Sequence, residues 1–168
     1  MVKDNKIKKG FSIGEVMLSV FILGTTLTAL ISLYATGIKH LVDERENIIA
    51  SLLAQEGIEL VRNKRDNNWI NGRVSFNGLG ARNNCSLSYN NDICGTSLNL
   101  NYDGSYYTHG TGASTKFRRR IRIEGTGTTR TITSLVTWNS TNPPIDFNSC
   151  NTGNKCVFSS ATLTEWGE

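Results

Sequence analysis

The chain has 168 residues, enough for one globular domain together with a long helix. Its 18 Lys and Arg against 14 Asp and Glu give a formal net charge of +4, but residues 1–10 alone hold four lysines and one aspartate. The remainder has 14 basic and 13 acidic residues, a net charge of +1. The basic pI of about 9.0 is therefore mostly a property of the N-terminus, and it does not indicate a nucleic-acid partner.

A long apolar run follows the basic N-terminus. Residues 16–38 contain no charged side chain, and about 20 apolar residues suffice for a helix to cross a bilayer. The preceding lysines predict that the N-terminus stays in the cytoplasm, so that the body of the chain lies outside, across the cytoplasmic (inner) membrane. Glu15 stands at the start of the run. A carboxylate there costs on the order of 2.5–3.5 kcal/mol to insert, so we expect it to have a partner or a function.

Residues 8–15, with the sequence KKGFSIGE, resemble the processing motif of type IV prepilins and of type II secretion pseudopilins. The resemblance implies that a prepilin peptidase cuts after Gly10 and methylates the new N-terminal residue, Phe11. It also implies that Glu15 serves assembly with other pilin or pseudopilin subunits, which would contact the chain through its N-terminal helix. The mature protein would then reside in the membrane and afterwards in a pilus or pseudopilus.

Three other interpretations of this stretch explain less. A secretory signal has an apolar core of roughly 7–15 residues and a cleavage site after it, whereas this core is longer and carries Glu15. A plain membrane anchor, or the buried helix of a soluble protein, leaves the Gly10–Phe11 pair and Glu15 as coincidences. We therefore divide the chain into a leader at 1–10, a transmembrane or filament-core helix at 11–38, an amphipathic helix at 39–66 and a β-rich head at 67–168.

One continuous helix is predicted from residue 11 to about residue 66, because this segment contains no proline. Beyond Lys39 its apolar residues recur on one face, which predicts packing against a sheet. Glu46 and Glu56 fall near this face and are expected to be paired, and Trp69 is expected to anchor the helix end under the head. The apolar face consists of Ile38, Val42, Ile49, Leu52, Leu53 and Leu60, flanked by Ala50, Ala54, Gly57 and Val61.

After residue 67 the composition shifts to Asn, Ser, Thr and Gly, with short β-prone segments between turn signals. The Gly-Thr repeats at residues 125–128 predict a hairpin between the first two of the stronger strands. The expected fold class is α+β: a long N-terminal helix packed on a small antiparallel sheet of three to five strands, as in pilins. Strands are predicted at 117–124, 131–138 and 156–163, with weaker ones near 86–89 and 98–102.

All four cysteines lie in the part of the chain expected outside the cytoplasm, where an even number indicates two disulfides. Three pairings are possible. We favour Cys85 with Cys94 and Cys150 with Cys156, because each closes a short polar loop. The spacings do not fit a metal site.

One predicted strand of the head is unusually rich in arginine. Arg118, Arg120 and Arg122 alternate along the strand at 117–124 and should share one face. Together with Lys116 they offer contacts to DNA phosphates. The alternative is a solvated sheet face or edge-strand charges that oppose aggregation, and the net charge of +1 favours this alternative.

The sequence contains no catalytic constellation. With two histidines and cysteines committed to disulfides there is no credible nucleophile–base pair, and no phosphate-binding glycine loop occurs. Residues 99–104 predict a turn and not a calcium loop. We expect no enzyme, no cofactor and no metal. The favoured function is a minor pilin-like subunit that enters or primes a filament; the alternatives are a minor pseudopilin of a type II secretion system or a membrane-tethered module that binds DNA or a surface.

Overall fold

The computed structural model describes residues 10–89 and 91–165, so all of the leader before Gly10 lies outside the described residues. By its internal contacts the chain divides into two compact units, Met1–Asp43 and Glu44–Glu168. The first contains the apolar part of the helix. The second contains the remainder of the helix and the head.

Helix α1 runs from Ile13 to Ile70 and ends four residues later than predicted. Gly72 ends it with a φ of +67°, donating its N–H to the carbonyl of Trp69, while Arg73 donates to the carbonyl of Asn68. These two hydrogen bonds form a Schellman cap, for which glycine is the preferred residue. Trp69 therefore belongs to the helix. Its side chain is 50% exposed, so the prediction that it anchors the helix under the head is wrong.

The face of α1 that packs on the sheet is centred on small residues, not on the large ones that the pattern favoured. Leu52 is 59% exposed. A Cβ at Gly57 would lie 2.3 Å from the Ser134 hydroxyl oxygen, so the helix and sheet backbones approach too closely for a side chain there. The buried residues of the helix are Ala50, Leu53, Ala54, Gly57, Ile58, Val61, Arg65 and Asn68.

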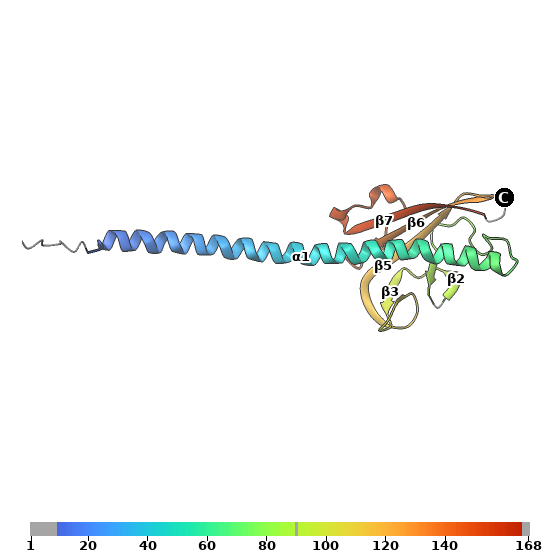
Figure 1. Cartoon of the computed structure of the whole chain (residues 1–168), viewed down its shortest axis with the longest axis horizontal. Helices are drawn as coiled ribbons and strands as arrows, with labels where there is room; N and C mark the ends of the chain where they lie inside the picture. The colour runs from blue at the N-terminus through green and yellow to red at the C-terminus, as the bar shows by residue number, and fades with distance from the viewer. Residues whose placement is uncertain (1–9, 90, 166–168) are drawn as a thin grey trace, which may run out of the picture. The chain divides into compact units, whose positions relative to one another are not determined.

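The head is built on a five-stranded antiparallel sheet with the order β4-β3-β5-β6-β7 (Figure 1). The three stronger predicted strands are confirmed as β5, β6 and β7, and residues 125–128 connect β5 and β6 as a hairpin. The short strands β2 and β4 were not predicted. The bounds are β3 Asn99–Tyr102, β4 Tyr107–Thr108, β5 Ala113–Glu124, β6 Thr129–Thr137 and β7 Cys156–Thr164; a separate antiparallel pair consists of β1 Ser86–Ser88 and β2 Asn91–Gly95.

The core lies between the second half of α1 and one face of this sheet. Two clusters of buried residues each combine helix and strand side chains, and the expected α+β fold with its pilin-like arrangement of helix and sheet is confirmed. At roughly 25 cal/mol per Å² of apolar surface, this burial is the main stabilising term. The first cluster includes Ile58, Val61, Leu79, Ile121 and Ile132, and the second Ala50, Leu53, Leu100, Phe117 and Val136.

Both favoured disulfides are present. Cys85 pairs with Cys94 and ties the start of β1 to β2, while Cys150 pairs with Cys156 at the start of β7. The second bond closes a loop that contains the short 3-10 helix η2 (Thr152–Asn154), and another 3-10 helix, η1 (Phe147–Ser149), directly precedes Cys150. Each disulfide contributes about 2–3 kcal/mol in the chain-entropy description of short loops.

Candidate functional site

The Gly10–Phe11 peptide bond lies just outside the helix in exposed backbone. Gly10 is exposed and Phe11 is 84% exposed, whereas α1 begins at Ile13. The carbonyl of Ser12 accepts the first helical hydrogen bonds, from the N–H groups of Glu15 (3.0 Å) and Val16 (3.2 Å). Exposed, non-helical backbone close to a terminus is the kind of segment that a peptidase can bind in extended form.

Glu15 lies in the first turn of α1, with an exposed side chain. A carboxylate there is favoured by the positive end of the helix dipole. Phe11 precedes Glu15 by four residues in the sequence and lies two residues before the helix begins. Gly10, Phe11 and Glu15 are all exposed, and they lie immediately before or within the first turn of α1.

Helix α1 is long and apolar enough in its first part to cross a membrane. Several of its polar side chains there form hydrogen bonds within the helix. The hydroxyl groups of Thr25, Thr26 and Thr28 each donate to a backbone carbonyl three or four residues earlier. Such internal bonds allow threonine to enter hydrocarbon at low cost, since no water is needed to satisfy its hydroxyl.

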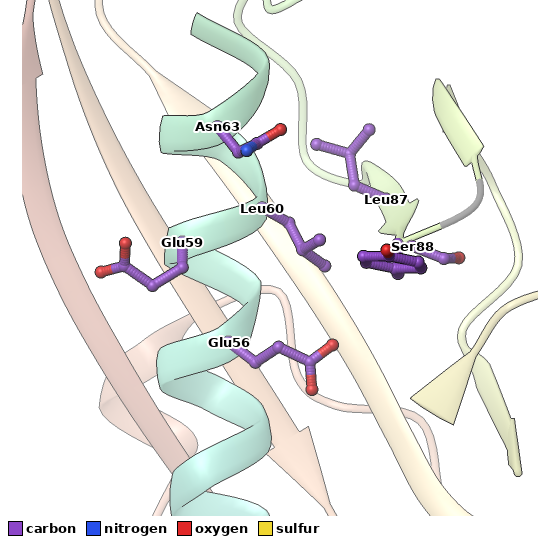
Figure 2. Close-up of a pocket in the computed structure, with 7 residues that line it drawn as sticks. Glu56, Glu59, Leu60, Asn63, Leu87 and Ser88 are labelled. Atoms are coloured by element: carbon purple, nitrogen blue, oxygen red, sulfur yellow. The ribbon is translucent and has the colours of Figure 1, made fainter. Parts of the chain in front are cut away.

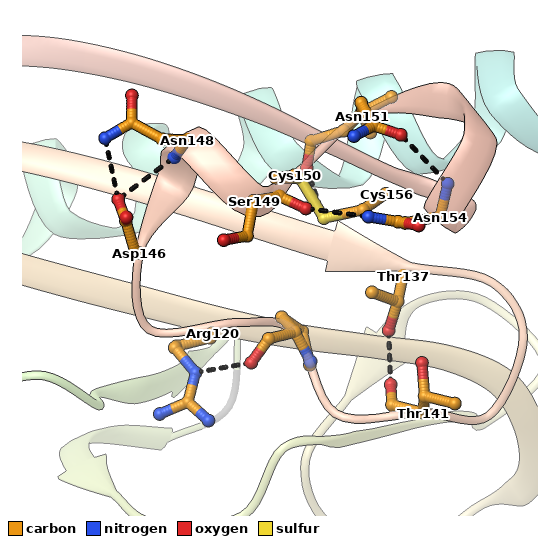
Figure 3. Close-up of a disulfide and its surroundings, with 12 residues drawn as sticks. Arg120, Thr137, Thr141, Asp146, Asn148, Ser149, Cys150, Asn151, Asn154 and Cys156 are labelled. Atoms are coloured by element: carbon orange, nitrogen blue, oxygen red, sulfur yellow. Dashed lines mark hydrogen bonds between the residues drawn. A yellow bond between two sulfur atoms is a disulfide. The ribbon is translucent and has the colours of Figure 1, made fainter.

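Arg118, Arg120 and Arg122 on β5 form hydrogen bonds with other parts of the head. Arg118 donates to the Asn142 side-chain oxygen at 2.6 Å, Arg120 to the Pro143 carbonyl at 3.0 Å and Arg122 to a carbonyl of the same loop at 3.4 Å. Figure 3 shows this loop crossing Arg120 beside the Cys150–Cys156 disulfide.

The three arginines share a face of β5, as predicted, but all are partly buried, so the expected solvated sheet face is wrong. A DNA phosphate at this face would have to compete with the acceptors that the loop already supplies. The loop is itself held by the Cys150–Cys156 bond and by the Thr137 hydroxyl, which donates to the Thr141 carbonyl.

Arg119 differs from the other arginines of β5 in its position on the strand. It lies on the apolar face of the strand and is fully buried, donating to the carbonyls of Leu53 on α1 (3.2 Å) and Leu87 on β1 (2.9 Å). Burial lowers the pKa of Arg119, and the Glu56 carboxylate 3.3 Å away opposes that effect. The prediction that Glu56 is paired is therefore confirmed. An arginine at an apolar position of an alternating strand was the signal that could have identified this contact.

Glu46, the second helix carboxylate expected to be paired, bonds Lys116 of β5. This pair and the pair formed by Glu56 both join α1 to β5. The second half of the helix is thus attached to the sheet by two ion pairs as well as by its apolar face.

A pocket of about 250 Å³ lies between α1 and β1 (Figure 2). Glu56, Leu60 and Asn63 face β1, whereas Glu59 points away from it. Leu87, Ser88 and Tyr89 form the opposite wall. Across the described residues there is no group of three His, Cys, Asp or Glu that could hold a metal ion.

Comparisons with known protein families, with curated proteins and with solved structures gave no significant match to this chain. The pilin-like architecture therefore stands on the helix and sheet described above. The more specific assignment depends on Gly10, Phe11 and Glu15, which sit together at an exposed helix start directly before the apolar segment.

Proposed function

We propose that this protein is a minor type IV pilin-like subunit that is cut after Gly10, methylated on Phe11 and then incorporated into a filament or used to prime one. The single observation that carries the proposal is the continuity of α1: directly after the Gly10–Phe11 pair, an apolar span and a helix face packed on a β-sheet follow one another in one uninterrupted helix. In this proposal the protein is a substrate of an enzyme and not an enzyme itself.

Cleavage changes the charge at the start of the helix. Before it, the Phe11 nitrogen belongs to a neutral amide; hydrolysis leaves a carboxylate on Gly10 and an ammonium on Phe11. Monomethylation keeps that nitrogen basic. The ammonium can then pair with Glu15 of the same chain or of a neighbouring subunit, which removes the cost of two unpaired charges in a filament core of low dielectric constant.

The head suits a role outside the cytoplasm. Two disulfides persist only in an oxidising compartment, and both lie in the part of the chain that follows the apolar segment. This topology supports insertion with the N-terminus in the cytoplasm and the head on the far side of the membrane.

The proposal is tested by fractionating cells into sheared filaments and membranes and quantifying the protein in each. We expect the mature form in the filament fraction, or a loss of filaments when the gene is deleted. If the protein stays in membranes and filaments are unaffected by the deletion, the proposal fails. Loss of secreted proteins without loss of surface filaments would assign it instead to the pseudopilins of a secretion system.

A further inference from the structure

The sequence contains two triplets of the form Asn-X-Ser/Thr in which X is not proline, the pattern at which an asparagine side chain can receive a sugar. They begin at Asn84 and at Asn139. An acceptor of this kind belongs to a surface loop of an exported protein. The two disulfides support export of the head, and the surroundings of each asparagine distinguish the two triplets.

The triplet at Asn139 lies on an exposed loop that follows β6. Asn139, Ser140 and Thr141 are all exposed, and Ser140 turns the chain with a φ of +62°. The Ser140 N–H donates to the carbonyl of Lys116 on β5 at 3.2 Å, and the hydroxyl of Thr137, the last residue of β6, donates to the Thr141 carbonyl (Figure 3). The triplet is thus presented on the surface in a turn that is attached to two strands.

The side chain of Asn139 is oriented by the third residue of its triplet. Its amide oxygen accepts from the Thr141 N–H at 3.1 Å and from the Thr141 hydroxyl. A backbone N–H can only donate, so the atom that it contacts is the amide oxygen and the other atom is the nitrogen Nδ2. Among the described residues, Nδ2 of Asn139 makes no hydrogen bond. The atom that would receive a sugar therefore has no partner to give up.

The triplet at Asn84 matches the same pattern in a different environment. Asn84 is half-buried, and its Nδ2 donates to the Thr96 carbonyl at 2.8 Å. Its middle residue, Cys85, is buried and disulfide-bonded, and its third residue, Ser86, is 2% exposed. A sugar on Asn84 would break the bond to Thr96 and would require the triplet to leave the head. The contrast favours modification at Asn139 alone.

We propose that Asn139 is a site of N-linked glycosylation, modified outside the cytoplasm by a transferase whose donor is a sugar joined through its C1 carbon to a lipid diphosphate. In the transfer a bond forms between Nδ2 of Asn139 and C1, the bond between C1 and the diphosphate oxygen breaks, and Nδ2 releases one proton. The lipid diphosphate is the leaving group, and no oxidant or reductant takes part. The proposal depends on export of the head and not on a place in a filament.

The test is fragmentation mass spectrometry of the peptide that contains Asn139, from the full chain isolated from membranes of the cells that produce it. We expect a sugar on Asn139 and none on Asn84. Asn139→Gln removes the acceptor and Thr141→Ala removes the hydroxyl of the triplet, so each should abolish the modification completely. Thr141→Ser keeps a hydroxyl at this position and should retain the sugar.

Asn142→Gln is the matched control, because Asn142 is an exposed asparagine of the same loop that is followed by two prolines and begins no such triplet. It should leave the sugar in place. Titration of free thiols under denaturant checks that every variant retains both disulfides. The proposal is overturned if Asn139 carries no sugar, or if Thr141→Ala is modified as fully as the parent chain. A sugar on Asn139 of a protein that never enters filaments would uphold this proposal and contradict the filament role.

Discussion

The guanidinium of Arg119, which has no exposed surface, lies 3.3 Å from the carboxylate of Glu56 and joins strand β5 to helix α1. Glu56 directly precedes Gly57, where an added Cβ would lie 3.1 Å from the Arg119 side chain. It places a full positive charge inside the head with one partly exposed counter-ion. An arginine in this position makes the attachment of the helix to the sheet dependent on charge as well as on apolar packing.

We predict that Glu56→Gln lowers the free energy of unfolding of the head by about 2 kcal/mol. Loss of one partner from a fully buried ion pair costs roughly 3–5 kcal/mol, and the partial exposure of Glu56 reduces this figure. The control is Glu59→Gln, which breaks the exposed pair with Arg62 and should cost less than about 1 kcal/mol. Urea unfolding of the two variants measures both changes. Equal decreases in the free energy of unfolding would show that Arg119 does not need its counter-ion.

The head should fold without the apolar span, because the two larger core clusters and both disulfides lie between residues 50 and 163. Residues 39–168 produced in an oxidising compartment should be soluble and contain no free thiol under denaturant. Peptide mapping should recover Cys85 with Cys94 and Cys150 with Cys156. Four free thiols in folded protein would contradict this prediction.

Acid should destabilise the head through His109. Burial lowers the pKa of His109 from 6.5 to about 4, and the charge of Arg119 acts in the same direction. The unfolded chain therefore takes up this proton at a higher pH than the folded one. The stabilisation is complete above pH 6.5 and is lost as the pH falls toward 4, by about 3 kcal/mol in all.

The measurement for this effect is the free energy of unfolding of the head at pH 7 and pH 4.5, compared with that of His109→Gln. The substitution removes the titrating group and should flatten the part of the profile between these values. A profile unchanged by His109→Gln would assign the acid sensitivity between these pH values to other groups.

Glu15 should matter for assembly and not for insertion or cleavage. We expect Glu15→Ala to be inserted, cut and methylated, yet depleted from sheared filaments relative to membranes, because its partner ammonium on Phe11 would be left unpaired in the filament core. Glu44→Ala removes an exposed carboxylate of α1 outside the apolar run and serves as the control. Normal incorporation of Glu15→Ala would mean that the carboxylate does not select processed subunits.

Much of this fold can be predicted from local sequence patterns. Alternation around Ile121 and Ile123, a glycine turn at residues 125–128 and short cysteine spacings predict the β5–β6 hairpin and both disulfides, because each depends on residues close in sequence. The helix end was misplaced because the cap depends on the positive φ of Gly72, and one glycine in a sequence does not reveal its backbone conformation.

The contacts that sequence patterns missed are the long-range ones. Arg119 lies on the apolar face of its strand, but its partner Glu56 lies 63 positions earlier, on the helix. Likewise the partner of Glu46, Lys116 of β5, lies 70 positions later in the sequence.

The most direct test of the central claim is the intact mass of the mature protein isolated from membranes, together with the mass of its N-terminal peptide. The account predicts a chain that begins at Phe11 with one added methyl group, and an uncut chain for Gly10→Val, because a side chain before the scissile bond obstructs the peptidase. Gly14→Ala, in the first turn of α1, should be processed normally, because the added Cβ would make only an ordinary contact of 3.8 Å with the Ser12 hydroxyl oxygen. A mature protein that begins at Met1, near Gly37, or at an unmethylated Phe11 would contradict the account.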